Sequence, residues 1–165
     1  MDFLQTTLCY LEKDGCYLML HRVKKKNDAN HDKWVGVGGK FEPGEDALAC
    51  VQREVTEETG LAMQAPIYRG IVDFYCDLWP AERMHLYTCT QFTGTMTDCD
   101  EGTLEWVPKQ AVQALPIWQG DKIFFDLLAK DAPFFHLELF YNGDTLIRAV
   151  LDGEELPLHY AGCDC

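Results

Sequence analysis

The 165-residue sequence lacks any run of about 20 apolar residues, the length that a membrane-spanning helix requires. It also lacks a basic segment ahead of an apolar stretch at its N-terminus, so we expect no secretory signal peptide. An apolar share of 47% and an aromatic share of 12% indicate a globular chain. These features predict a cytoplasmic protein without a membrane partner, with one domain over residues 1–155 and a flexible tail over residues 156–165.

The eight cysteines include no C-x-x-C pair, and the chain is too long for a small disulfide-stapled scaffold. Free cysteine behaves as a small buried hydrophobe, so we expect reduced thiols within apolar patterns. Cys163 and Cys165 offer at most two soft ligands on the tail, which is a weak metal site. The cysteines within apolar patterns are Cys9, Cys16, Cys50, Cys76 and Cys89.

Basic residues are scarce, with 14 Lys and Arg against 27 Asp and Glu and a net charge of −13. Binding to a nucleic acid polymer depends on neutralising phosphates, so we expect no such partner. A local basic cluster nevertheless exists, which alone is either a solvated loop or a phosphate contact. Its position before an acidic segment favours a small phosphorylated ligand. The cluster comprises Arg22, Lys24, Lys25, Lys26, Lys33 and Lys40.

The segment from Gly39 to Leu61 contains the densest set of chemical groups. Pro43-Gly44 predicts a turn, and residues 45–59 contain neither Gly nor Pro and predict a helix of about four turns. Gly60 is the expected C-terminal stop of this helix. The predicted apolar stripe comprises Leu48, Val51 and Val55.

Three glutamates, Glu54, Glu57 and Glu58, share an adjacent face of this predicted helix. Like charges at i,i+3 and i,i+4 destabilise a helix by roughly 0.2–0.5 kcal/mol per pair. Clustered carboxylates are also the ligands that Mg²⁺ accepts. Glutamates alone are more often a solvated acidic face, but the surrounding glycines and Arg53 favour a metal site.

The segment matches one fixed pattern at every specified position: Gly39, Glu45, Arg53, Glu54, Val55, Glu57, Glu58, Gly60 and Leu61. This pattern resembles the Nudix box of the MutT-like Nudix hydrolases. Nine specified positions at fixed spacing make a chance match very unlikely. The resemblance implies metal-dependent hydrolysis of a nucleoside diphosphate linked to another group, with Mg²⁺ as cofactor and Mn²⁺ as a possible substitute.

The order of predicted elements is strand, strand, helix, several strands, helix and a closing hairpin, which indicates a mixed sheet with helices on both sides. The resemblance implies the same α/β class, a Nudix α/β/α sandwich with a mixed central β-sheet and a loop-helix-loop catalytic motif. A second helix begins at Asp121, with Ile123, Phe124, Leu127 and Leu128 facing the core. Predicted strands cover residues 4–11, 16–20, 34–39, 67–78, 84–92, 104–107, 134–141 and 145–151.

The resemblance implies a role for each matching residue. Metal ligands would be the Gly38 carbonyl and the carboxylates of Glu54, Glu57 and Glu58. Glu101 would be a further ligand or a water-activating carboxylate, and these glutamates and Arg53 form the catalytic set. Structural residues would be Gly39, Glu45 and Gly60. Substrate contacts would be Thr7, Arg22, Val35, Val37, Gly38, Gly39, Lys40, Trp118 and Asp121.

Within that set, Arg22 and Lys40 would meet phosphate, Trp118 would stack on or wall the base, and Asp121 would bond to the base edge. The alternatives are a core tryptophan and a helix-capping aspartate. Both residues lie where the resemblance reaches beyond the box.

The segments LHRVKKKND, KWVGVGGKFEPGE, DEGTLEWVP and IWQGD resemble the bacterial 8-oxo-dGTP diphosphatase branch, and this likeness spans roughly residues 5–150. It implies hydrolysis of 8-oxo-dGTP or other oxidised purine nucleotides to the monophosphate and pyrophosphate, which protects the nucleotide pool. Two positions depart from the mammalian pattern: Val35 replaces an Asn, and Gln119-Gly120-Asp121 retains one of two consecutive aspartates. Phosphate chemistry is therefore better indicated than base selectivity.

Two alternatives follow from that gap. The chain is another Nudix pyrophosphohydrolase, acting on ordinary dNTPs, ADP-ribose or dinucleoside polyphosphates, or a Nudix-like nucleotide sensor without activity. The sequence leaves open the number of metal ions, the identity of the general base, and the choice between monomer and homodimer.

Overall fold

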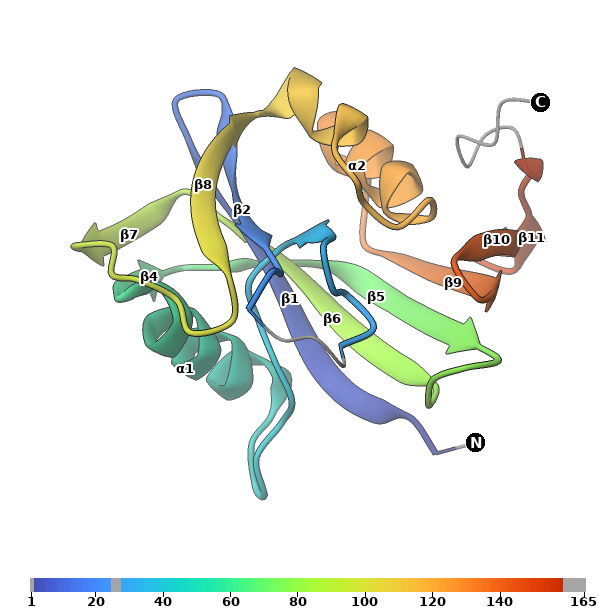
Figure 1. The fold of residues 1–165 in the computed structure, drawn as a ribbon, viewed down its shortest axis with the longest axis horizontal. Coiled ribbons are helices and arrows are strands. Elements are labelled where there is room, and N and C mark those ends of the chain that lie inside the picture. The colour runs from blue at the N-terminus through green and yellow to red at the C-terminus, as the bar shows by residue number, and fades with distance from the viewer. Residues whose placement is uncertain (1, 25–27, 159–165) are drawn as a thin grey trace.

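The computed structural model describes residues 2–24 and 28–158 (Figure 1). The helical elements are α1 (Ala47–Thr59), the 3-10 helix η1 (Lys109–Ala114) and α2 (Asp121–Ala129). The first strands are β1 (Leu4–Lys13), β2 (Cys16–His21), β3 (Trp34–Val35), β4 (Leu61–Gln64), β5 (Ile67–Cys76) and β6 (Glu82–Cys89). The remaining strands are β7 (Gln91–Gly94), β8 (Thr103–Pro108), β9 (Phe135–Asn142), β10 (Thr145–Leu151) and β11 (Glu154–Glu155).

Nine of these strands form one mixed sheet in the order β11-β10-β9-β5-β6-β1-β2-β3, with β8 pairing β2. The pairs β1/β6 and β5/β9 are parallel, and the other pairs are antiparallel. Strands β4 and β7 form a separate two-stranded sheet. The predicted mixed central sheet is confirmed.

The two α-helices lie on opposite sides of the central sheet (Figure 1). Successive side chains of a strand point to opposite faces, so β1 supplies both cores. Cys9 packs with Val51 and Val55 on the α1 side, whereas Tyr10 packs with Phe124 on the α2 side. This arrangement is the expected α/β/α sandwich.

Helix α1 is rotated and slightly shorter than expected. It begins at Ala47 because Asp46 is the N-cap, whose carboxylate accepts the Ala49 N–H at 2.8 Å. Leu48, predicted to join the apolar stripe, is 45% exposed, and Cys50 is buried in its place. Contact with β1 sets this rotation, since the Thr7 hydroxyl lies 3.4 Å from Cys50 Sγ.

Several further elements differ from the sequence expectation. The pairing of β4 with β7 and the short strand β11 were not predicted, and β6 begins at Glu82 rather than at residue 84. Beyond β3, residues 36–40 form no regular strand and make only single bridges to β1, at Cys9–Val37 and Thr6–Lys40. On α2, Phe125 is buried and Leu128 only partly so.

The cysteines that the structure describes are all free: Cys9, Cys16, Cys50, Cys76, Cys89 and Cys99. Lys25, Lys26, Cys163 and Cys165 lie outside the described residues, as does most of the predicted tail. Leu156, at the start of that tail, donates its N–H to the Ala149 carbonyl at 2.8 Å. Within residues 2–24 and 28–158, neither α-helix has the length and apolar character to cross a membrane.

Candidate active site

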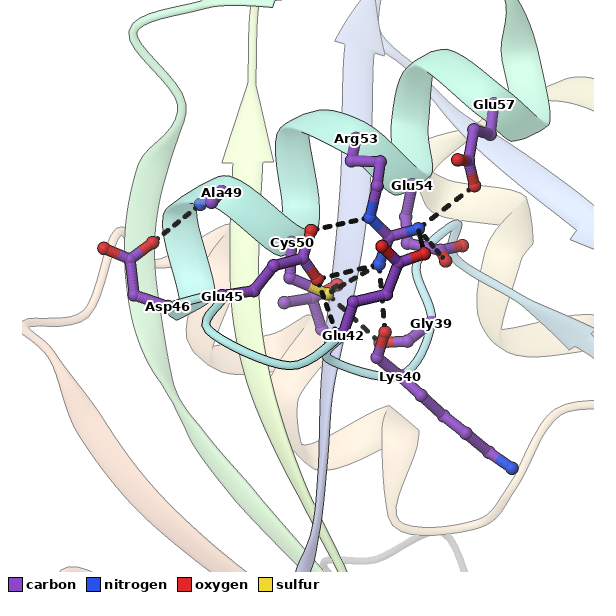
Figure 2. A network of polar contacts seen from close by, with 11 residues as sticks. Gly39, Lys40, Glu42, Glu45, Asp46, Ala49, Cys50, Arg53, Glu54 and Glu57 are labelled. Carbon is purple, nitrogen blue, oxygen red and sulfur yellow. Dashed lines mark hydrogen bonds and ion pairs between the residues drawn. The ribbon is translucent and has the colours of Figure 1, made fainter.

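Arg53 ties helix α1 to the loop that precedes it (Figure 2). Its Nε and Nη2 donate to both Glu45 oxygens at 2.6 and 2.9 Å, and Nη1 donates to Glu54 at 2.7 Å and to Glu57 at 3.1 Å. Nη2 also donates to the Lys40 carbonyl at 3.1 Å. A planar guanidinium has five donors in a fixed fork, so one side chain can hold several acceptors. Hydrogen bonds from Arg53 lower the pKa of Glu45 to about 2.

The helix ends are set by local chemistry. Glu45 Oε1 accepts the Glu42 N–H at 2.7 Å and closes the loop before the Asp46 cap. Gly60 has φ of 79°, and its N–H bonds to the Thr56 carbonyl at 2.9 Å. Glycine takes this left-handed conformation without a steric penalty, which explains the stop.

Two glycines bring the backbone against the acidic face of α1. A β-carbon on Gly38 would overlap the Thr7 carbonyl oxygen, and one on Gly39 would lie 2.5 Å from Glu54 Oε2. Thr7 N–H donates to the Gly39 carbonyl at 2.9 Å, and Gly38 N–H lies 3.4 Å from Glu58 Oε1. A side chain at position 38 would push the loop away from β1, and one at position 39 would displace the Glu54 carboxylate.

Glu58 is a buried carboxyl group whose Oε2 has no hydrogen-bond partner. Burial, followed by the nearby carboxyls of Glu101 and Glu54, raises its pKa to about 9. Among the described residues no acidic side chains are already arranged as a closed metal-binding group. Arg53 takes one oxygen from each of Glu54 and Glu57. An oxygen-only donor set with an unpartnered buried oxygen nevertheless fits a hard divalent cation.

Arg22, predicted to meet phosphate, is held between two carboxylates. Its Nη1 donates to Glu101 Oε2 at 3.0 Å, and its Nε donates to Asp28 Oδ2 at 2.9 Å. The predicted basic cluster does not form a single surface, because its described members turn in different directions. Lys24 donates to the Cys99 carbonyl at 2.7 Å, whereas Lys33 pairs with Asp144 at 3.4 Å.

A cavity of about 740 Å³ joins the loop before α1 to the start of α2. The lining divides into a polar set from the loop and α1 and an apolar set from the central sheet and Trp118. The polar set includes Arg22, Gly38, Gly39, Lys40, Arg53, Glu54 and Glu101. The apolar set includes Leu8, Phe74, Met84, Trp118 and Leu139. Charged groups and an apolar wall therefore share one cavity, and Figure 2 shows the Lys40 side chain extending away from Arg53.

Trp118 is both a core residue and part of the cavity wall. The residue is 5% exposed, and its ring packs edge-to-face on Phe74 and Tyr141, with centroids 5.1 and 4.9 Å away. Lys33 Nζ lies 4.3 Å from the ring centroid. Trp118 is therefore a buried core residue that also lines the cavity.

Asp121 lines the cavity from the first residue of α2 and is 6% exposed. Gly120 occupies the N-cap position, and α2 has no side-chain capping bond, so the helix-cap alternative is wrong. Burial raises the pKa of Asp121 to about 8, although the charge of Lys33 opposes the shift.

Some of the other predicted site residues line the cavity, and others do not. Val37 is fully buried in the α1-side core and does not line the cavity, because pairing with Cys9 fixes its direction. Val35 lines the cavity but is only 7% exposed, and Thr7 lines it with its hydroxyl directed to Cys50. Glu57 and Glu58 lie outside the lining residues.

Sequence reasoning missed several residues that line the cavity. Phe74 and Met84 come from β5 and β6, and no local pattern indicates which strands flank the cavity. Glu82, which accepts a bond from the Thr6 hydroxyl at 2.7 Å, and Asn30 were also missed. Their place depends on strand order and loop path, which the sequence pattern does not contain.

Comparisons with known proteins agree with this geometry. Residues 4–128 match the family model described as the NUDIX domain. An uncharacterized Nudix hydrolase of Bacillus subtilis is 31% identical over 163 residues, covering 94% of this chain and 99% of that protein. The oxidized purine nucleoside triphosphate hydrolase of Danio rerio is 25% identical, covering 79% and 85%. A solved MutT protein from Bacillus halodurans has a TM-score of 0.79 at 29% identity, covering 91% and 98%.

Proposed function

The chain belongs to the Nudix family, and on that premise we propose that it is a Mg²⁺-dependent pyrophosphohydrolase of oxidised purine nucleoside triphosphates, with 8-oxo-dGTP as its main substrate. The products would be the monophosphate and pyrophosphate, and the role would be protection of the cytoplasmic nucleotide pool. One observation carries the proposal: Arg53 and Glu54 of the Nudix box line the same cavity as the apolar wall around Trp118 and Asp121. A nucleotide has the same two chemical parts.

The metal would be held by oxygen donors only: the Gly38 carbonyl, Glu54, Glu57, Glu58 and Glu101. The unpartnered Glu58 Oε2 supports this proposal, since mutual repulsion among Glu54, Glu58 and Glu101 is relieved by a cation. When bound, Mg²⁺ neutralises phosphate charge and lowers the pKa of a coordinated water. Mn²⁺ has the same preference for oxygen ligands and would substitute.

The protein's own side chains would supply positioning and proton transfer. Arg53 orients Glu54 and Glu57 through its Nη1 donors. Lys40 and Arg22, which both line the cavity, would face the phosphates. A carboxylate oxygen of a box glutamate or of Glu101 would accept the proton of the attacking water. Phosphoryl transfer demands little covalent chemistry from a protein, so this set is sufficient.

The apolar part of the cavity would receive the base. Phe74 and Trp118 offer apolar walls, and Asp121 offers a carboxyl group. With a pKa of about 8, this carboxyl is protonated at neutral pH and can donate as well as accept a hydrogen bond. The Danio rerio relative, named for hydrolysis of oxidized purine nucleoside triphosphates, supports the same substrate class.

The test is pyrophosphate release from 8-oxo-dGTP, dGTP, dATP, ADP-ribose and a dinucleoside polyphosphate, with Mg²⁺ and with EDTA. We expect a kcat/KM for 8-oxo-dGTP at least about tenfold above that for dGTP, and no turnover in EDTA. A preference below a few-fold would instead support a Nudix pyrophosphohydrolase of other substrates. Binding without turnover of any nucleotide would support a sensor.

A further inference from the structure

The loop residue Asn30 bonds to Trp118 across the cavity wall. The Trp118 Nε1–H donates to Asn30 Oδ1 at 2.6 Å. An indole N–H is a donor only, so the partner atom must be the amide oxygen rather than the amide nitrogen. The orientation of the Asn30 amide is therefore set by chemistry, and its NH₂ group points away from the indole.

Asn30 is held firmly for a loop residue. Its backbone N–H lies 3.3 Å from Asp28 Oδ1, and its carbonyl accepts the Lys33 N–H at 2.9 Å. Trp118, its side-chain partner, is buried between Phe74 and Tyr141. Such a donor is pre-organised, because little conformational entropy is lost when it binds a ligand.

The NH₂ group of Asn30 is available to donate hydrogen bonds to a ligand. Asn30 lines the cavity and is partly buried. Across residues 2–24 and 28–158, the side chain bonds to Trp118 through its oxygen, and its nitrogen has no hydrogen-bond partner. Val35 and Phe74, which also line the cavity, carry no polar side-chain atom, whereas Asn30 and Asp121 do.

We infer that the Asn30 NH₂ group donates a hydrogen bond to a carbonyl oxygen of the purine base, which makes Asn30 a specificity-determining residue. The inference rests on the proposed function, since it assigns the base that the same cavity receives. An exocyclic amino group or a C–H at this position would leave the amide donors unpaired or facing another donor. Purines with a carbonyl oxygen there are accepted, and their amino or unoxidised counterparts are disfavoured.

The test uses Asn30→Asp, which keeps an oxygen acceptor for Trp118 but removes the NH₂ donors. Calorimetry in EDTA measures the Kd of four monophosphates in two pairs, dIMP against dAMP and 8-oxo-dGMP against dGMP. Within each pair the bases differ mainly at one site, C6 or C8, so the added charge cancels in the ratio. We expect the preference for the carbonyl-bearing member to fall about tenfold in at least one pair. The pair that responds identifies the oxygen.

Two further variants make the result specific. Asn142→Asp makes the same chemical change at an exposed position at the end of β9 and leaves both ratios unchanged. Asn30→Ala removes the Trp118 acceptor as well, and it weakens the carbonyl preference similarly. Tryptophan fluorescence and the Tm confirm that Asn30→Asp keeps the fold.

Unchanged ratios in a folded Asn30→Asp protein would overturn the inference, as would a wild-type protein that binds none of the four monophosphates. Neither result depends on turnover. If the wild type hydrolyses no nucleotide triphosphate but Asn30→Asp shifts a ratio, the proposed reaction fails and the assignment of Asn30 stands. If the wild type hydrolyses 8-oxo-dGTP but the ratios do not move, the proposed reaction stands and the assignment of Asn30 fails.

Discussion

Gly39 and Glu54 are in direct contact: a β-carbon on Gly39 would lie 2.5 Å from Glu54 Oε2. The contact places the backbone of the glycine-rich loop against a candidate metal ligand. The lack of a side chain at position 39 therefore matters for the proposed chemistry, because Arg53 holds the Glu54 carboxylate at 2.7 Å and limits how far it can move.

Gly39→Ala should displace the Glu54 carboxylate and reduce kcat by about 10²-fold, since misplacement of about 1 Å has that effect. Steady-state pyrophosphate release measures the change. Gly44→Ala is the matched control, because Gly44 has φ of +82° with open space around it. That variant should lose about 1 kcal/mol of stability from backbone strain and keep its kcat. A Gly39→Ala protein with wild-type kcat would contradict the assignment of Glu54.

Arg53→Lys should lower kcat at least about tenfold, because an ammonium group cannot reproduce a fork that contacts Glu45, Glu54 and Glu57 together. The same steady-state assay applies. Arg69→Lys is the control, since Arg69 pairs with the exposed Asp131 and such surface pairs contribute little. Equal kcat values for the two variants would show that Arg53 does not position the glutamates.

Glu57→Gln should reduce turnover by about 10²–10⁴-fold, the usual effect of losing a group that takes part in proton transfer or charge stabilisation. The Glu57 side chain is 58% exposed, so the fold and Tm should not change. Glu105→Gln, on the exposed side of β8, should retain full activity. Retention of more than about a tenth of the wild-type rate by Glu57→Gln would remove Glu57 from the catalytic set.

Asp121 should make the protein less stable as pH rises from about 4 to about 8. Its folded pKa of about 8 lies above the ordinary value of 3.8, so the folded state binds more protons than the unfolded state in that interval. The stability that this bound proton contributes is fully present below the unfolded pKa and is lost as pH rises through the folded pKa. The slope is at most about 1.4 kcal/mol per pH unit.

Urea unfolding of the wild type and of Asp121→Asn between pH 5 and pH 9 measures this effect, because this range extends to about one pH unit above the folded pKa and further below it. The free energy of unfolding of the wild type should fall relative to that of the variant as pH rises. Asp131→Asn, at an exposed site, should follow the wild type. Parallel curves for wild type and Asp121→Asn would show that Asp121 is not protonated in the folded state at neutral pH.

The loop-helix-loop was predictable because its determinants are local. The turn at Pro43-Gly44 and the left-handed stop at Gly60 need only the residues beside them. The exposure of Leu48 was not predictable, because contact with β1 decides which side of the amphipathic helix faces the sheet. The burial of Val37 was not predictable for the same reason, since its direction follows from pairing with Cys9.

Residue types and their spacing were sufficient to predict the family, the α/β/α fold and the acidic helix, because fixed spacing on one helix brings carboxylates together without help from distant residues. The apolar side of the cavity, in contrast, depends on tertiary contacts. Asn30 and Trp118 are 88 positions apart, and Arg22 and Glu101 are 79 apart. Such contacts arise from strand order and loop path, and a linear pattern of residue types does not contain them.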